Sequence, residues 1–193
     1  MTDGAHVLPA APERWLDVET VFGTRGDAAH CWCQWFKLDR AAFEFRSDDE
    51  LRTALQRQVA GGRTPGVVAY RDGEPAGWCA VESRSAYPQL LRRAETGGAE
   101  EGDVWSVTCF VVRPAFRRRG VAGDLLDAAV EHARAGGASA VEAYAVDVER
   151  RTRVAASELY HGPLSLFLAH GFEVVSRTSK ARAVVRRDLA ADA

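Results

Sequence analysis

An apolar strand followed by an amphipathic helix is the clearest pattern in the chain. Val104 to Val112 are nearly all apolar or small, with β-branched and aromatic residues on both faces, as in a strand covered on both sides. Arg113-Pro114 ends this strand, because proline cannot donate a sheet hydrogen bond. A helix is predicted from near Gly120 to a stop at Gly136-Gly137. Its apolar residues share one face: Ala122, Leu125, Leu126, Ala129 and Ala133.

The residues before this unit predict two helices and a hairpin. Apolar residues at helical spacing and a proline start predict a helix from Pro12 to Phe22. A second helix opens at Ser47 with the Ser-x-x-Glu spacing of a capping box and ends near Ala60. Asp72-Gly73 is a strong turn signal. It joins the two strands of the hairpin, Val67 to Arg71 and Ala76 to Glu82.

The remaining segments are connections and closing elements. Met1 to Ala11 fits a loose end or a short edge strand, and Ser83 to Gly102 is a long connection with a short helix at Tyr87 to Ala94. A strand, a polar connection, a short helix and two strands follow the amphipathic helix: Ala140–Val146, Asp147–His161, Leu164–His170, Phe172–Ser176 and Ala183–Leu189.

Length and composition limit the class of protein. The 193 residues suit one domain with a full core, and 47% hydrophobic residues fit a globular chain. The net charge of −2 gives no overall drive toward nucleic acid or a membrane surface. The sequence shows no charged-then-apolar leader and no apolar run of bilayer length, so we expect a cytoplasmic protein.

The cysteines do not predict a disulfide scaffold or a metal site. His30-Cys31-x-Cys33 has the composition of half a metal site, but no second Cys/His pair stands at finger spacing. We therefore expect no metal, and small buried thiols at Cys31, Cys33, Cys79 and Cys109. Cys109 lies in the central strand, where it could approach a bound thioester, although core packing is the simpler interpretation.

The loop between the central strand and the amphipathic helix has the composition of an anion site. A helix N-terminus carries unpaired N–H groups and a partial positive charge. Three arginines add charge, and two glycines let an anion approach the backbone. The loop lacks the Gly-Lys-Ser/Thr of a P-loop and the spacing of a dinucleotide fingerprint. The residues concerned are Arg117, Arg118, Arg119, Gly120, Val121, Ala122 and Gly123.

Two motifs resemble those of one known family. Arg117-x-x-Gly120-x-Ala122, after a strand that ends in Val-Arg-Pro, resembles the pyrophosphate-binding motif of the GNAT acyltransferase superfamily. Downstream, LSLFLAHGFEVV is similar to the helix, Gly-Phe corner and strand that close that fold. The two motifs cover about the C-terminal half. The alternative for the first motif is a solvated basic loop at the start of an ordinary helix.

The resemblance implies both a fold and a reaction. With the element pattern, it predicts one α/β (α+β) domain over residues 1–193, built on a central, mostly antiparallel mixed sheet of six or seven strands flanked by helices. Residues 103–189 would bind acyl-CoA and residues 1–102 would face the acceptor. The implied activity is an acyl-CoA-dependent N-acyltransferase (EC 2.3.1 type), in which a primary amine attacks acetyl-CoA directly. Acetyl-CoA would be a co-substrate.

The resemblance also assigns residues to coenzyme A. Main-chain groups of Phe110, Val111 and Val112 would contact the pantetheine, and Arg117 to Gly123 would hold the pyrophosphate. Phe167 stands where many relatives carry a tyrosine four residues before the Gly-Phe corner. It would line the pantetheine path without donating a proton.

The catalytic acid and base are less constrained. Tyr160, seven residues before Phe167, is the candidate acid that protonates the departing thiolate. Glu82, at the end of a hairpin strand, is the first candidate for the base, ahead of Glu142 and the weaker Asp103. Exposed carboxylates are usually only solvated, so a structural role is the simpler interpretation for each of them.

The sequence leaves the acceptor and the partners open. The aromatic segment HCWCQWFKL fits either core packing or one wall of an acceptor pocket, and the resemblance favours the pocket. A group of acidic residues predicts a cationic acceptor, unless it is only a solvated loop: Glu82, Glu95, Glu100, Glu101 and Asp103.

A non-catalytic acyl-CoA-binding module is the main alternative function. A nucleic-acid-binding domain that uses Arg117–Arg119 and Arg150–Arg153 disagrees with the near-neutral charge. A homodimer is compatible with the sequence.

Overall fold

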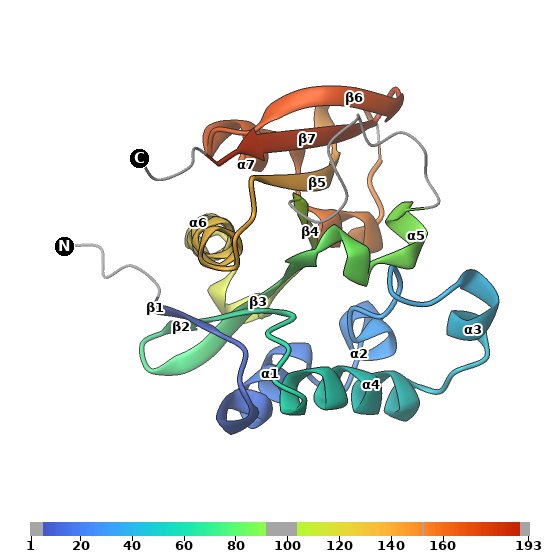
Figure 1. Ribbon diagram of the computed structural model, residues 1–193, viewed down its shortest axis with the longest axis vertical. Helices are drawn as coiled ribbons and strands as arrows, with labels where there is room; N and C mark the ends of the chain where they lie inside the picture. The colour runs from blue at the N-terminus through green and yellow to red at the C-terminus, as the bar shows by residue number, and fades with distance from the viewer. Residues whose placement is uncertain (1–5, 92–103, 152, 190–193) are drawn as a thin grey trace.

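A twisted sheet forms the centre of the molecule (Figure 1). The computed structural model describes residues 6–91, 104–151 and 153–189. In this part the sheet has seven strands in the order β1-β2-β3-β4-β5-β7-β6. The β4–β5 pair is parallel and the other pairs are antiparallel, which confirms the predicted mixed, mostly antiparallel sheet. The strands are β1 (His6–Pro9), β2 (Gly66–Arg71), β3 (Glu74–Ser83), β4 (Val104–Val112), β5 (Ala140–Val146), β6 (Glu173–Ser179) and β7 (Arg182–Asp188).

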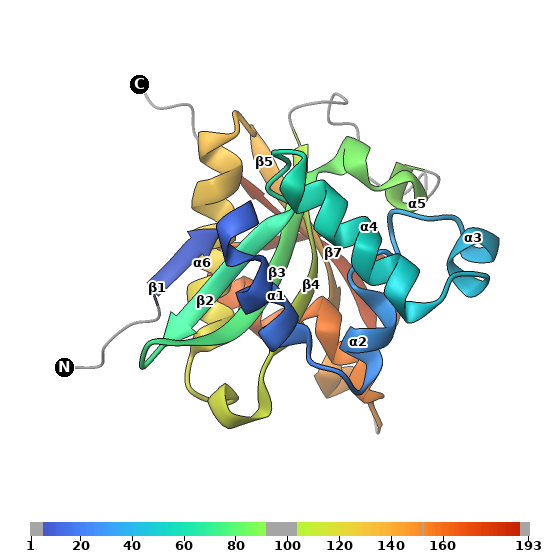
Figure 2. The same cartoon turned by 90° about the horizontal axis from the view of Figure 1, so that it is seen from below.

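Helices cover both faces of this sheet. Figure 2 shows α1 and α4 in front of β2 to β4, with α6 behind them. None of the helices in the described ranges is long and apolar enough to cross a membrane. The helices are α1 (Trp15–Phe22), α2 (Asp27–Cys31), α3 (Arg40–Glu44), α4 (Asp48–Ala60), α5 (Pro88–Leu91), α6 (Val121–Ala135) and α7 (Leu164–Ala169). Short 3-10 turns are η1 (Pro12–Arg14), η2 (Arg84–Ala86), η3 (Pro114–Phe116), η4 (Val148–Arg150) and η5 (Ala156–His161).

Local signals account for most of these boundaries. Ser47 caps α4, and the Glu50 side chain returns a bond to its backbone, so the predicted capping box is confirmed. Asp72 and Gly73 are both left-handed, as a tight hairpin turn requires. The predicted helix from Pro12 divides into η1 and α1, and β1 is the edge strand expected before it. The predicted Tyr87–Ala94 helix is described only as α5, since residues 92–94 lie outside the described ranges.

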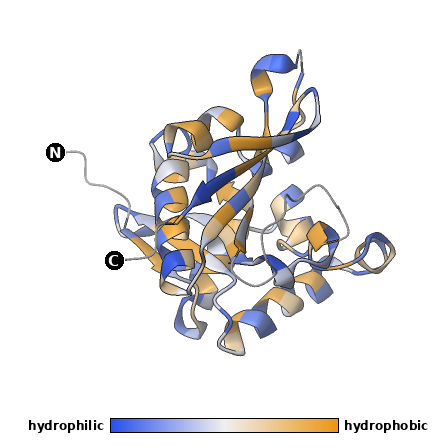
Figure 3. Cartoon of the chain, turned by 45° about the horizontal axis from the view of Figure 1, so that its top comes forward, coloured by the Kyte–Doolittle hydropathy of each residue, from blue (hydrophilic) through white to orange (hydrophobic). Residues whose placement is uncertain are grey.

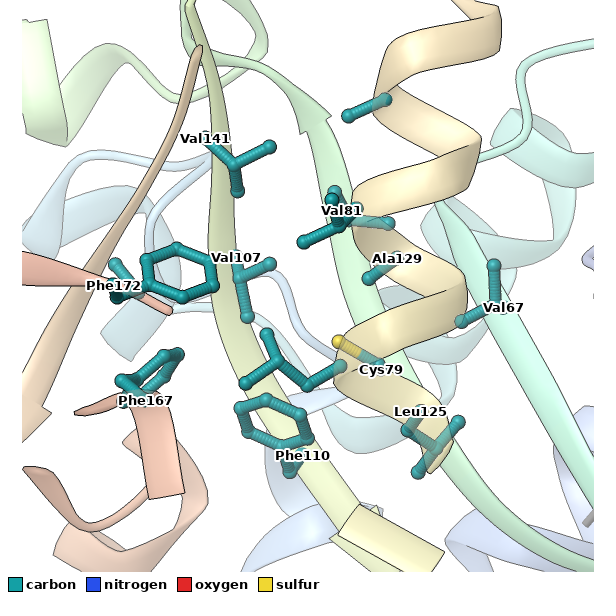
Figure 4. Packing of buried hydrophobic residues seen from close by; sticks show 14 of the residues in the cluster. Val67, Cys79, Val81, Val107, Phe110, Leu125, Ala129, Val141, Phe167 and Phe172 are labelled. Atoms are coloured by element: carbon teal, nitrogen blue, oxygen red, sulfur yellow. The ribbon is translucent and has the colours of Figure 1, made fainter. Parts of the chain in front are cut away.

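Two apolar clusters hold the layers together. The apolar face of α6 packs on the sheet, where Leu125 and Ala129 are fully buried beside Val107 and Phe110 (Figure 4). Fully burying such a leucine contributes about 1.5–3 kcal/mol. The hydropathy colours of Figure 3 alternate along the helices, as this one-sided packing requires. On the opposite face, the fully buried Trp78 anchors the cluster that fixes α1 and α4.

Candidate active site

The two parallel strands in the middle of the sheet separate along their length. The β4–β5 pairing runs only from Val104 opposite Ala140 to Val107 opposite Ala143. Thr108 then forms a bulge, because Val81 faces Val107 while the preceding Ala80 faces Cys109. From Thr108 onward β4 has no strand partner on its β5 side among the described residues. The sheet therefore has an open edge at its centre.

Strand alternation decides which backbone groups this open edge presents. The Arg113 N–H donates to Ala76 O at 3.0 Å, toward β3. Val112 therefore points the opposite way, and its carbonyl accepts from Arg117 Nε at 3.1 Å. Phe110, two residues earlier, has its N–H and C=O on the same open edge. The backbone of Val111 faces β3, and its predicted main-chain contact to the pantetheine stays a prediction.

The start of α6 has a backbone geometry that suits an anion. Gly120, the N-cap residue, is left-handed with φ of 83°, and no side chain in the described part of the protein caps it. Gly123 N–H donates to the Gly120 carbonyl at 2.8 Å, whereas the N–H groups of Val121 and Ala122, which precede it in the first turn, have no acceptor within the helix. A Cβ on Gly120 would meet no described atom within 4 Å, so the space before the helix is open. An anion placed there would meet both these N–H groups and the positive end of a 15-residue helix.

The three arginines of this loop are not equivalent. Arg119 pairs with Asp72 at 3.1 Å and lies over the Phe116 ring at 5.6 Å. Arg117 and Arg118 are exposed, and the described residues offer neither of them an ion pair. Arg118 is also left-handed, with φ of 58°, which is uncommon for a residue with a side chain. The uncompensated charge at the helix start therefore comes mainly from Arg117 and Arg118.

Gly123 has a packing role, and its predicted contact with an anion stays a prediction. A Cβ at this position would lie 2.9 Å from His170 Nε2. His170 follows α7 and contacts α6 again through Asp127, at 2.7 Å from its Nδ1. The glycine therefore lets the end of α7 approach α6.

Phe167 is a core residue at the base of the open edge. Its side chain is fully buried, and its ring lies 5.9 Å from that of Phe110 and 5.4 Å from that of Phe172 (Figure 4). A Cβ on Gly162 would come within 2.8 Å of the same ring. Phe167 packs against Phe110 of the open edge from within the core. Its predicted contact with the pantetheine stays a prediction.

A cavity of about 1110 Å³ opens on the α2 side of the sheet. It meets the open edge at Thr108, where η5 crosses β4 and places Tyr160 and His161 in the lining. The aromatic segment between α2 and α3 forms one wall, through Trp35 and Phe36, which agrees with the pocket interpretation. The full lining is Phe22, Asp27, Ala28, His30, Cys31, Cys33, Trp35, Phe36, Phe43, Thr108, Cys109, Val111, Tyr144, Ser157, Glu158, Tyr160, His161, Thr178, Arg182, Ala183 and Val184.

Tyr160 and His161 line this cavity with two side chains that can exchange protons. Burial, and next the charge of Asp27, raise the pKa of the Tyr160 hydroxyl, which therefore stays protonated near neutral pH. His161 Nδ1 lies 3.1 Å from the Thr108 carbonyl oxygen, and an oxygen of this kind only accepts. Nδ1 must carry the proton, so the lone pair of the neutral ring is on Nε2. Sequence reasoning missed His161, although it directly follows Tyr160.

The two carboxylates favoured as bases are held in buried ion pairs. Glu82 pairs with Lys37, and burial lowers the pKa of that lysine in spite of the pair. Glu142 lies between Arg84 at 3.2 Å and Arg186 at 3.3 Å. Neither carboxylate is among the described residues that line the cavity. The third candidate, Asp103, lies outside the described ranges, as do Glu95, Glu100 and Glu101.

Three of the four cysteines line the cavity: Cys31, Cys33 and Cys109. Burial raises the pKa of Cys31 to about 11. The adjacent Cys33 thiol, and then burial, raise the pKa of Cys109 well above its ordinary value. The Cys31 and Cys109 thiols are therefore protonated and poorly nucleophilic at neutral pH. In the described part of the chain no three His, Cys, Asp or Glu side chains are grouped to hold a metal ion.

Comparison with known proteins identifies similar chains. The model of the acetyltransferase (GNAT) family matches residues 32–161. A search of curated proteins finds no match.

Solved structures share the fold at low sequence identity. The GNAT domain of S. lividans PAT has a TM-score of 0.56 at 15% identity, over 96% of this chain and 90% of that one. PaiA N-acetyltransferase from Thermoplasma acidophilum, in complex with coenzyme A, has a TM-score of 0.53 at 12% identity, over 96% of this chain and 99% of that one. A GNAT acetyltransferase from Streptococcus pneumoniae has a TM-score of 0.55 at 14% identity, over 96% of this chain and 99% of that one. These similarities confirm the expected fold.

Proposed function

This chain belongs to the acetyltransferase (GNAT) family, and we propose that it transfers an acetyl group from acetyl-CoA to a primary amine by direct attack. The observation that carries the proposal is the meeting of two features at Thr108. The open edge of β4, next to the anion site of α6, lies on one side, and the cavity lies on the other. This arrangement lets two substrates reach the same point from opposite faces of the sheet.

The residues present fit coenzyme A. The N–H groups at the start of α6, with Arg117 and Arg118, would hold the pyrophosphate. Val121 and Ala122 belong to this first turn, and Arg119 would contribute less because Asp72 already pairs with it. PaiA N-acetyltransferase from Thermoplasma acidophilum, which has the same fold, was solved in complex with coenzyme A, and this supports coenzyme A as the ligand.

In this proposal the open edge of β4 binds the thioester, and the cavity supplies the groups that transfer protons. Acetyl-CoA, when bound, supplies a thioester, whose acyl carbon is open to attack by an amine. The Phe110 N–H, the one nearer to Thr108 on the open edge, would donate to the carbonyl oxygen of the thioester, where negative charge develops during attack. Tyr160 would give its proton to the departing sulfur. As the C–N bond forms and the C–S bond breaks, the proton lost by the amine needs a base.

We assign that base to His161 in place of Glu82. His161 lines the cavity beside Thr108, and its bond to the Thr108 carbonyl leaves the basic lone pair of the neutral ring on Nε2. Glu82 would first have to leave Lys37 and then reach a cavity that it does not line. A buried carboxylate separated from its partner is costly. Glu82 therefore has a structural role in this proposal.

The test separates an enzyme from an acyl-CoA-binding module. Calorimetry measures the affinity for coenzyme A, and release of free thiol from acetyl-CoA measures turnover with a panel of amines, with the acetylated product identified by mass spectrometry. We expect both binding and amine-dependent release. Binding without release by any amine would favour the non-catalytic module, and absence of binding would contradict the whole assignment.

A further inference from the structure

The cavity lining points to the chemical class of the acceptor. We propose that the acceptor is a primary amine on a flat aromatic body that carries no second charge. The proposal rests on the acyltransferase function above and names the substrate of the same site. It replaces the sequence-based expectation of a cationic acceptor.

Aromatic rings from separate parts of the chain surround the cavity. Trp35 and Phe43 meet edge to face with ring centres 5.1 Å apart, and Phe36 stacks on Tyr144 at 6.2 Å. All four side chains belong to the lining, with Phe22 and Tyr160 at other points of it. Rings prefer offset-stacked or edge-to-face partners, so this wall favours a planar aromatic guest over a saturated one of equal size.

The size of the cavity also favours a ligand with a substantial apolar body. A volume of about 1110 Å³ lies just above the range of about 300–1,000 Å³ usual for pockets that hold small organic molecules. The attacking nitrogen must reach Thr108 and His161, where the cavity meets the open edge of β4. The rest of the acceptor then lies among the aromatic side chains.

The charges of the lining are largely neutralised by the protein itself. Glu158 pairs with Arg151 at 2.7 Å and with Arg182 at 3.0 Å. His30 pairs with Asp48 at 2.6 Å. Asp27 is exposed, so it is solvated without any ligand. A second ammonium group in this cavity would lose its hydration with no buried, unpaired carboxylate in the described lining to replace it.

Glu82, the first residue on which the sequence-based expectation of a cationic acceptor rested, is not available to bind an ammonium group. Glu82 was expected to attract an ammonium group, but it is buried and committed to Lys37. The other members of the acidic group lie outside the described residues.

The experiment compares matched acceptors and matched variants. Acetyl-CoA turnover is measured with 2-phenylethylamine, tryptamine, 2-cyclohexylethylamine, putrescine, kanamycin and a lysine peptide. We expect kcat/KM for the aromatic amines to exceed that for the saturated ring and for the polycations by about tenfold or more. With phenylethylamine as the acceptor, Phe43→Ala should raise KM about tenfold without changing coenzyme A affinity. Phe45→Ala is the control, because Phe45 is 89% exposed, ends the same helix and does not line the cavity.

Two separate readouts distinguish the failure of this inference from failure of the function. Normal coenzyme A binding, with turnover fastest for putrescine, kanamycin or the peptide, overturns the acceptor class and leaves the acyltransferase intact. Equal rates for the phenyl and cyclohexyl amines, or a Phe43→Ala variant with parental KM, overturn it as well. If coenzyme A does not bind, calorimetry with phenylethylamine and the free protein decides: binding weakened by Phe43→Ala supports the aromatic site, and absence of binding refutes it.

Discussion

The anion site and the cavity lie on either side of the same strand but are built in different ways. The anion site takes its parts from consecutive residues, Arg117 to Gly123, where a loop enters a helix. The cavity takes its lining from α1, α2, the segment leading to α3, α3 itself, β4, β5, η5, β6 and β7. A local site depends on backbone conformation, whereas a dispersed site depends on side chains that only the tertiary fold brings together. Mutations should therefore act differently in the two regions.

The largest effect is expected in the cavity, from Tyr160→Phe. The substitution removes one hydroxyl and little volume, and loss of a general acid typically costs about two to four powers of ten in rate. The anion site is untouched, so coenzyme A affinity should stay at the parental value. Steady-state rates and calorimetry on the same preparation measure the two quantities.

The pH dependence gives this prediction a second test. Burial raises the Tyr160 pKa above its ordinary value of 10.0, and an acid must be protonated to act. A loss of rate due to Tyr160 should therefore occur only as the pH rises above 10. Parental rates in Tyr160→Phe would mean that Tyr160 only packs and that water protonates the thiolate.

The next largest effect is expected at the anion site, from Gly120→Val. Left-handed backbone costs a residue with a side chain about 1–2 kcal/mol, and a β-branched residue tolerates it poorly. Since a Cβ there meets no described atom within 4 Å, the fold should persist while the loop shifts. Coenzyme A affinity should fall about tenfold or more by calorimetry. Gly120→Asn is the matched control, because asparagine accepts this conformation more readily.

An unaltered affinity in a folded Gly120→Val protein would remove the case for a backbone anion site. Circular dichroism establishes that the variant is folded. A loss of the same size in Gly120→Asn would instead assign the effect to the volume of the added side chain.

These contrasts also explain how much the sequence could predict. The strand Val104–Val112, the capping box at Ser47 and the hairpin turn at Asp72-Gly73 follow from neighbouring residues, and the structure reproduces them. The position of the anion loop is local in the same sense. The charge balance of this loop is not local, because the Asp72 that pairs with Arg119 lies in the β2–β3 turn.

The rest depends on contacts between distant segments. The bulge at Thr108 fixes the strand alternation that turns the Val111 backbone toward β3. Glu82 forms an ion pair with Lys37, which lies 45 positions earlier in the chain. The tautomer of His161 depends on a carbonyl in β4, 53 positions away. No periodicity or motif encodes such pairings, so the sequence alone favoured a carboxylate that the fold holds in an ion pair.

A smaller effect should separate the arginines of the anion site. Arg118→Ala should weaken coenzyme A binding severalfold, because this charge has no ion pair among the described residues. Arg119→Ala should weaken it less, because Asp72 already offsets that charge at 3.1 Å. Calorimetry at low and high salt is the measurement, and the difference should shrink at high salt. A larger loss in Arg119→Ala would mean that Arg119 leaves Asp72 when the ligand binds.

The smallest effect is expected from Gly123→Ala, which tests whether this glycine belongs to the anion site at all. Two terms oppose each other: alanine favours the helix by about 0.8–1 kcal/mol, while its Cβ would lie 2.9 Å from His170 Nε2. The free energy of unfolding should therefore change by about 1 kcal/mol or less. In a His170→Ala background the contact is absent, so the same substitution should become stabilising. Coenzyme A affinity should stay constant throughout this double-mutant cycle. An affinity loss that persists in the His170→Ala background would return Gly123 to the anion site, since the packing contact could not then account for it.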